Sequence, residues 1–149
     1  MILWWIYCNI HFKTIAKLSK HQNIAGIKDS TTSVDQLRQK IKNVGKDFVI
    51  LAGTGSVLLP ALIEGVKGGV LALANVAPAE CISIFNLFND EKPTEAKNLQ
   101  STLIPVNQAI TSTYGVAGLK AAMDMVGYYG GKPRLPLETL NEFKKMELK

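Results

Sequence analysis

Asn23-Ile24-Ala25-Gly26-Ile27-Lys28-Asp29-Ser30 is the stretch of sequence that decides the fold of this chain. A short apolar run followed by small polar residues predicts a buried strand that ends close to Lys28. Alternate side chains of a strand share a face, so Lys28 is expected on the same side as Gly26. An amine shielded from water there would favour its neutral form, which is the form that a Schiff-base nucleophile requires. The alternative is an ordinary strand-end lysine that extends into solvent.

The composition limits the class of protein. The 149 residues fit one domain, and 47% hydrophobic with 19% charged residues is typical of a globular chain. The net charge of +5 comes from scattered lysines rather than from a basic run with aromatics, so no nucleic-acid partner is expected. Cys8 and Cys81 lie far apart in apolar segments, which favours free thiols in a reducing compartment such as the cytoplasm. His11 and His21 stand alone, so we expect neither a metal site nor a cofactor.

Residues 1–13 form an atypical apolar N-terminus. The opening Met-Ile-Leu-Trp-Trp-Ile-Tyr run is too short to span a bilayer, and it has no basic start and no small-residue cleavage site. We therefore expect no signal peptide, no transit peptide and no membrane association. The segment is interpreted as a strand or as a terminus that lacks its usual neighbours.

Residues 14–77 alternate between helix and strand patterns. A short helix over 14–20 precedes the Lys28 strand, and Ser33 is a typical N-cap for a helix that extends to about Asn43. Two further apolar strands are predicted over 48–52 and 69–74, with a helix over 57–64 between them. Continuous apolar strands that alternate with helices indicate parallel βαβ units and an α/β fold class.

Residues 78–149 contain helix patterns only. Helices are predicted over 78–88, 93–113, 116–126 and about 138–146, with Pro78 at a helix start and Gly115 as a break. In the longest of them the apolar residues recur at helical spacing: Ala96, Leu99, Leu103, Val106 and Ile110. These patterns indicate a helical tail behind the βα units.

Three polar or aromatic segments leave alternatives open. Gly53-Thr54-Gly55-Ser56 before a helix has the composition of a phosphate cradle, but a dinucleotide fingerprint would need a third glycine where Leu58 stands. A plain strand-to-helix turn is therefore favoured. Asp29-Ser30 is interpreted as a turn and cap rather than as an acid–base pair. Tyr128-Tyr129 is interpreted as packing of the tail rather than as a binding platform.

Four segments in the same order resemble the C-terminal half of the dihydrodipicolinate synthase and N-acetylneuraminate lyase family. They are GIKDS (26–30), LAGTGS (51–56), GGVLALAN (68–75) and GVAGLKAAMDMVGYYGGKPRLPL (115–137). The resemblance implies the C-terminal part of a TIM (β/α)8 barrel, with about three parallel βα units and then a C-terminal helical tail. Residues 14–149 would be this partial barrel, with the βα units in 14–77 and the helical part in 78–149.

The resemblance also implies roles for three residues. Lys28 would be the catalytic lysine that forms a Schiff base with pyruvate or a related 2-oxo acid. Gly53 and Val70 would be substrate-binding residues at the ends of the next two strands, where barrel active sites are built. The implied activity is that of a lyase or aldolase, like dihydrodipicolinate synthase or 4-hydroxy-2-oxoglutarate aldolase, with pyruvate and an aldehyde as partners and a homo-oligomeric state.

The sequence departs from the family in its N-terminal half. That half supplies paired hydroxyl residues, which hold the pyruvate carboxylate, and a tyrosine that relays protons. No sound counterparts are present, and Tyr7 resembles the tyrosine only faintly. Two hypotheses follow: a Schiff-base-forming lyase, or a truncated and catalytically impaired relative that acts as a binding or subunit-association fragment.

Overall fold

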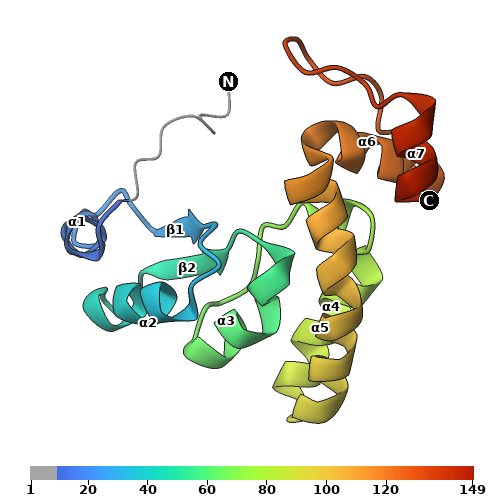
Figure 1. Cartoon of the computed structure of the whole chain (residues 1–149). Helices are drawn as coiled ribbons and strands as arrows, with labels where there is room; N and C mark the ends of the chain where they lie inside the picture. The colour runs from blue at the N-terminus through green and yellow to red at the C-terminus, as the bar shows by residue number, and fades with distance from the viewer. Residues whose placement is uncertain (1–9) are drawn as a thin grey trace.

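The computed structural model describes residues 10–149, so Tyr7 and the other residues of 1–9 lie outside the described part of the chain. The described residues form a strand-and-helix layer that continues into a group of helices (Figure 1). The layer runs α1 (Phe12–Leu18), β1 (Gly26–Asp29), α2 (Val34–Asn43), β2 (Val49–Ala52) and α3 (Leu58–Glu64). This order matches the alternation expected for 14–64.

Local signals explain the ends of these elements. Ser33 is the N-cap of α2, and its hydroxyl accepts a hydrogen bond of 3.3 Å from the backbone N–H of Gln36. Gly65 ends α3 in the left-handed conformation, with φ of 107°, which a glycine adopts without strain. Leu37 on α2 has no exposed surface.

β1 and β2 pair in parallel, with Lys28 opposite Leu51 and Asp29 opposite Ala52. The expected third strand over 69–74 is wrong for most of its length. Only a single bridge joins Ala52 to Gly69, and the chain then turns into a 3₁₀ segment, Leu73–Asn75. The ladder stops because β2 itself ends at Ala52 and the chain beyond it leaves the sheet, so the residues after Val70 have no strand to pair with.

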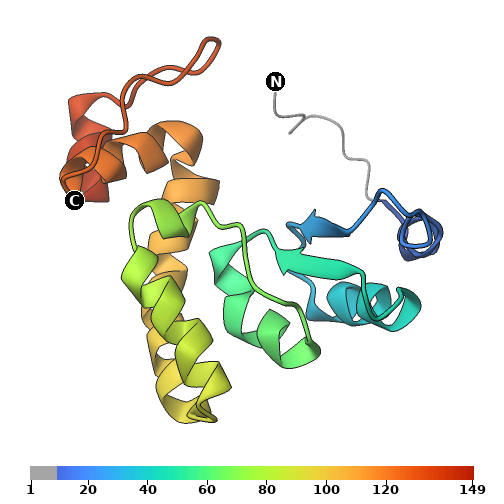
Figure 2. The ribbon, with the colours of Figure 1, turned by 180° about the vertical axis from the view of Figure 1, so that it is seen from behind.

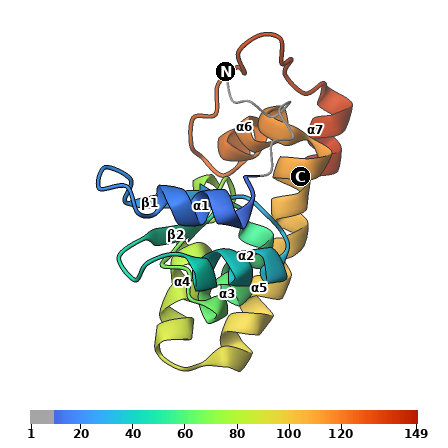
Figure 3. The same cartoon turned by 90° about the vertical axis from the view of Figure 1, so that its left-hand side faces the viewer.

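One face of the sheet is covered and the other is not. Figures 1 and 3 show α2 and α3 on the same side of the sheet. Ile50 and Ala52 point to that side and are buried at 3% and 0% exposure. Residues on the other face, Val49 and Val70, are 37% and 51% exposed. The described chain therefore presents an apolar sheet face to solvent.

The helical part begins with α4 (Pro78–Asn89) and α5 (Pro93–Gln108), which pack side by side (Figure 2). A π-helical segment, Ala109–Thr113, joins α5 to α6 (Gly115–Met125), and α7 (Glu142–Leu148) follows. The last helix starts later than expected because Asn141 is its N-cap and accepts a hydrogen bond of 2.9 Å from the Lys144 N–H. Between residues 10 and 149 no helix is both long and apolar enough to cross a bilayer.

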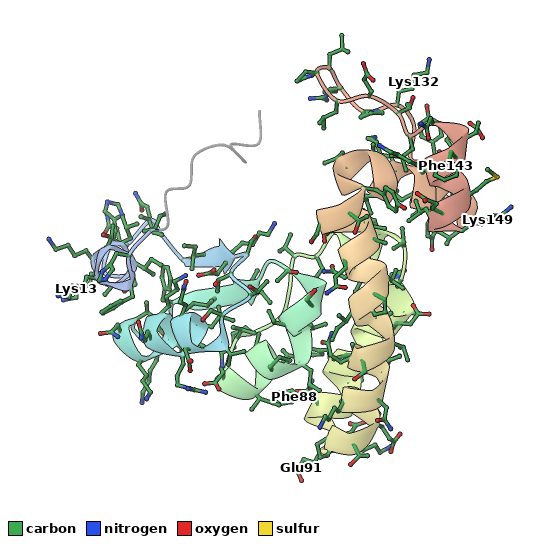
Figure 4. The ribbon with its side chains drawn as sticks, viewed as in Figure 1. Lys13, Phe88, Glu91, Lys132, Phe143 and Lys149 are labelled. Carbon is green, nitrogen blue, oxygen red and sulfur yellow. The ribbon has the colours of Figure 1, made fainter. Side chains whose placement is uncertain are left out.

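The loop between α6 and α7 extends away from the helices, and Figure 4 shows Lys132 on it. Tyr128 and Tyr129 are 53% and 88% exposed. The expectation that these tyrosines pack the tail is therefore wrong for this chain. The core lies instead between the sheet, α2, α3, α4 and α5, with Leu37, Leu73, Ile84 and Ile110 among its fully buried side chains.

Candidate active site

Lys28 lies at the C-terminal end of β1, one residue before the strand ends. Its side chain is exposed, so the expected shielding of this amine is wrong for this chain. The reason is the uncovered sheet face: Lys28 shares that face with Gly26 and lies opposite Leu51, and no described helix covers it. The amine is accordingly open to a small molecule from solvent.

Gly53 contacts Lys28 directly. A Cβ atom built on Gly53 would lie 2.8 Å from Lys28 Cε and 2.3 Å from Ser30 Oγ. The Gly53 N–H donates a hydrogen bond of 2.7 Å to the Asp29 carbonyl oxygen, which continues the β1–β2 ladder by one step. Only a residue without a side chain fits between these groups, so the end of β2 approaches Lys28 as closely as a backbone can.

Val70 lies at the same edge of the sheet. Its N–H donates a hydrogen bond of 2.8 Å to the Ala52 carbonyl oxygen, and the bridge between Ala52 and Gly69 puts Val70 beside Gly53 in the register. Val70 is half-exposed on the uncovered face. Lys28, Gly53 and Val70 thus come from three consecutive parallel segments and share one edge and one face of the sheet.

A buried ion pair lies on the opposite face from Lys28. The Lys40 amine on α2 donates a short hydrogen bond to Asp29 Oδ2, and the two side chains are 6% and 8% exposed. Asp29 Oδ1 accepts a further hydrogen bond of 2.9 Å from the Thr31 N–H. The turn expected at Asp29 is confirmed, whereas the ion pair was not anticipated from the sequence.

Two polar residues of α5 hold the Gly53-Thr54-Gly55-Ser56 turn. Gln100 accepts a hydrogen bond of 3.0 Å from the Leu59 N–H and donates one of 2.8 Å to the Gly55 carbonyl oxygen. Asn107 Nδ2 lies 2.8 Å from Ser56 Oγ and 3.3 Å from Thr54 Oγ1. The turn is therefore bonded to protein groups, which agrees with a structural strand-to-helix turn rather than a phosphate cradle.

The sequence contains a signal for these two residues that the apolar pattern alone did not reveal. Gln100 and Asn107 are 5% and 2% exposed, and they share the face of α5 that carries the buried core residues Ala96 and Leu103. The same stripe continues to the buried Ile110 in the π-helical segment. Spacings of four and three residues place all five on one stripe. Val106, which was expected on this stripe, is 40% exposed instead. A polar pair within an apolar stripe was the available clue.

Groups with shifted pKa values lie on other parts of the molecule. A hydrogen bond from Arg38 lowers the pKa of Glu64, with 2.6 Å between Arg38 Nη2 and Glu64 Oε1. Burial, and then the charge of Glu80, raises the pKa of the Cys81 thiol. Within residues 10–149, no group of three or more His, Cys, Asp or Glu side chains is placed to hold a metal ion.

The sequence of this chain matches a known protein family. The family model described as "Dihydrodipicolinate synthetase family" matches residues 5–149. The chain belongs to this family. The 4-hydroxy-tetrahydrodipicolinate synthase of Citrifermentans bemidjiense is 33% identical over 134 residues, which are 90% of this chain and 46% of that protein. The chain thus spans about half the length of the curated relatives that it matches.

Solved structures agree with the sequence relatives. The dihydrodipicolinate synthase DapA-2 of Bacillus anthracis superposes with a TM-score of 0.86 at 28% identity, covering 93% of this chain and 48% of that one. YagE of E. coli, a prophage protein of the dihydrodipicolinic acid synthase family that was crystallised in complex with pyruvate, gives a TM-score of 0.82 at 27% identity. The match covers 92% of this chain and 48% of the YagE chain. The fold is the C-terminal part of a TIM barrel followed by a helical tail.

Proposed function

We propose that this chain carries the Schiff-base half of a pyruvate-dependent lyase or aldolase site, with Lys28 as the nucleophile. The observation that carries the proposal is the place of Lys28 at the end of β1, exposed and in contact with Gly53. The ends of barrel strands are where such active sites are built. Membership of the family, and a relative that was crystallised with pyruvate, support a 2-oxo acid as the substrate class.

The chemistry assigned to Lys28 is covalent. Its neutral amine attacks the ketone carbon of pyruvate, and uptake of one proton with loss of one water molecule leaves a positively charged iminium between Nζ and that carbon. The iminium accepts electrons when a proton leaves the adjacent carbon, and the resulting enamine attacks an aldehyde. The same steps in reverse cleave the carbon–carbon bond. Hydrolysis then returns the free lysine and the 2-oxo acid.

Gly53 and Val70 take binding roles in this proposal. At Gly53 the absence of a side chain allows the backbone to lie against the Lys28 side chain, beside a ligand bonded to Nζ. Val70 offers an apolar surface on the same face, suited to the methyl group of pyruvate. Carboxylate binding and proton relay are functions of the family's N-terminal half, so in this proposal they come from outside residues 10–149.

Borohydride trapping tests the proposal. Incubation with pyruvate followed by reduction should leave a stable adduct on Lys28, located by peptide mass mapping, and Lys28→Arg should remove it while keeping the charge. Lys120, which donates a hydrogen bond of 2.6 Å to the Gly130 carbonyl oxygen, and Lys132 on the extended loop are internal controls. An adduct spread evenly over the lysines would contradict the assignment.

The uncovered sheet face favours a second candidate function, a fragment that associates with other subunits. Val49 and Val70 are exposed on it, and open sheet edges promote association. Sedimentation distinguishes the candidates: an oligomer that leaves Lys28 untrappable by pyruvate supports association alone. A Lys28 that pyruvate traps, in a monomer or in an oligomer, supports the catalytic role.

A further inference from the structure

We propose that Asn107 is a positioning residue for Lys28. It fixes the turn that begins at Gly53, and Gly53 in turn sets the place of the Lys28 side chain. This inference rests on the proposed function, because it concerns the geometry of the same lysine. The residue lies 79 positions further along the sequence than Lys28, on a helix of the C-terminal part.

The contacts of Asn107 are directed at one feature, the turn after β2. Its amide nitrogen lies within hydrogen-bond distance of two hydroxyl groups, 2.8 Å from Ser56 Oγ and 3.3 Å from Thr54 Oγ1. Thr54 Oγ1 also accepts from the Ser56 N–H at 3.4 Å. The amide thus ties together both hydroxyl side chains of the turn.

A purely apolar packing role does not explain an asparagine here. Asn107 is 2% exposed, and its Oδ1 is buried without a hydrogen-bond partner among the described residues. Exchanging the amide oxygen and nitrogen of Asn107 does not remove the problem. Only one of the two atoms reaches the hydroxyl groups, so the nitrogen would then lack a partner. A buried polar atom without a partner is unfavourable, so leucine would pack this position at lower cost. The hydrogen bonds from its nitrogen to the hydroxyl groups of Thr54 and Ser56 explain why an amide stands here.

The helical backbone is irregular on both sides of Asn107. Pro105 lies inside the helix two residues earlier, and the π-helical segment starts two residues later at Ala109. The Thr111 hydroxyl donates a hydrogen bond to the Asn107 carbonyl oxygen. Irregular helical turns of this kind occur frequently at functional sites.

The turn transmits its position to Lys28 through Gly53. The Gly53 N–H is bonded to the Asp29 carbonyl oxygen at 2.7 Å, and the space where its Cβ would lie is closed by Lys28 Cε and Ser30 Oγ. Close packing leaves no empty space between Gly53 and the aliphatic part of the Lys28 side chain. A loosened turn would therefore change how Lys28 is supported.

The test compares Asn107→Leu with Asn98→Leu in the full chain. Asn98 is exposed on the same helix, and nine residues of separation put it on the opposite face. Hydrogen exchange of peptides covering residues 53–59 should become about three- to tenfold faster in Asn107→Leu, the effect of losing one ordinary hydrogen bond. Asn98→Leu should exchange like the parent chain. Unchanged exchange of this peptide in Asn107→Leu would overturn the proposal.

Two readouts at Lys28 separate positioning from a merely structural role. The first is the rate and pH profile of pyruvate trapping. The second is the reductive methylation of Lys28 by formaldehyde, measured relative to that of Lys17. Methylation does not require a pyruvate site. Asn107→Leu should alter both, and Asn98→Leu neither. Asn107→Asp, whose carboxylate can accept from both hydroxyls, should restore part of each.

The outcomes distinguish this inference from the proposed function. Absence of trapping in the parent chain refutes the proposed function, and the methylation profile of Lys28 then still decides the role of Asn107. A faster-exchanging turn with an unchanged methylation profile would overturn the proposal, because Asn107 would then stabilise the turn alone.

Discussion

Asp29 and Lys40 form a buried ion pair on the face of β1 opposite Lys28, and they tie the strand end to α2. Each partner would be a costly isolated charge without the other, since both side chains are less than a tenth exposed. The pair therefore fixes the residue that follows Lys28 and, through the Asp29 carbonyl oxygen, the start of the turn at Gly53.

Lys40→Met should destabilise the chain strongly. Removing the amine leaves the Asp29 carboxylate buried, with the Thr31 N–H as its remaining hydrogen-bond donor among residues 10–149, and breaking such a pair costs about 3–5 kcal/mol. Urea unfolding measures the loss, with Lys42→Met at an exposed position of the same helix as the control. Adding Asp29→Asn to Lys40→Met should recover part of the loss. Equal stabilities of Lys40→Met and Lys42→Met would show that the ion pair is not buried in solution.

Gly53→Ala should disturb the lysine directly. The new methyl group would lie within 3 Å of Ser30 Oγ, Lys28 Cε and the Asp29 carbonyl oxygen, and the last of these is backbone. Forcing a methyl into so tight a space costs about 1–3 kcal/mol. We expect lower stability and slower pyruvate trapping at Lys28, measured by unfolding and by mass mapping.

Gly45→Ala is the matched control for Gly53→Ala. No heavy atom lies within 4 Å of the Cβ position at Gly45, so the change should be neutral or stabilise the chain by up to about 1 kcal/mol. Trapping at Lys28 should be unaffected. If both glycine variants trapped pyruvate like the parent chain, the close approach of Gly53 to Lys28 would have no functional role.

Cys81 should react slowly with alkylating reagents in the folded chain. Burial, and secondarily the charge of Glu80, raises its pKa, so the reactive thiolate forms only at higher pH than for an unfolded cysteine. Because the folded state favours the protonated thiol, this contribution to stability is present below the unfolded pKa and is lost as pH rises through the folded pKa. The pH profile of iodoacetamide labelling at Cys81, with and without urea, measures the difference. Identical profiles would contradict burial of the thiol.

The parts of the fold that local sequence determines were predicted well. The N-cap at Ser33 and the alternation of strands and helices both depend on neighbouring residues. The third strand failed because a strand needs a partner, and whether β2 continues beyond Ala52 is not encoded in residues 69–74.

The places of the three candidate residues at the strand ends were predicted, whereas their surroundings were not, and their roles stay a proposal. Lys28, Gly53 and Val70 meet at one edge, as strand order requires, yet the shielding of Lys28 depends on segments that would cover the inner sheet face. Asn107 was overlooked because an apolar pattern directs attention to Val106 one residue earlier. The polar residue within the apolar stripe indicates that Asn107 is buried, but it does not indicate that its partner is Ser56.

Turnover by this chain alone should be very low. In the proposed mechanism Lys28 is the nucleophile, whereas the carboxylate-binding hydroxyls and the proton-relay tyrosine come from the family's N-terminal half. Loss of one proton-transfer group commonly lowers rates by about 10²–10⁴. Lost positioning of the substrate lowers them further. We expect little or no aldol cleavage or condensation by these 149 residues alone, even where Lys28 is trapped.

Supplying the family's N-terminal half as a separate polypeptide should restore part of that activity, because it would cover the sheet face on which Val49 and Val70 are exposed and bring in the missing groups. The assay follows pyruvate consumption or release with candidate aldehydes, with and without that polypeptide, and the Lys28→Arg chain mixed with the same polypeptide is the control. Activity that appears equally with Lys28→Arg would belong to the added half. Robust turnover by the chain alone would show that its own residues replace the missing groups, and Tyr7→Phe would then be the first variant to measure.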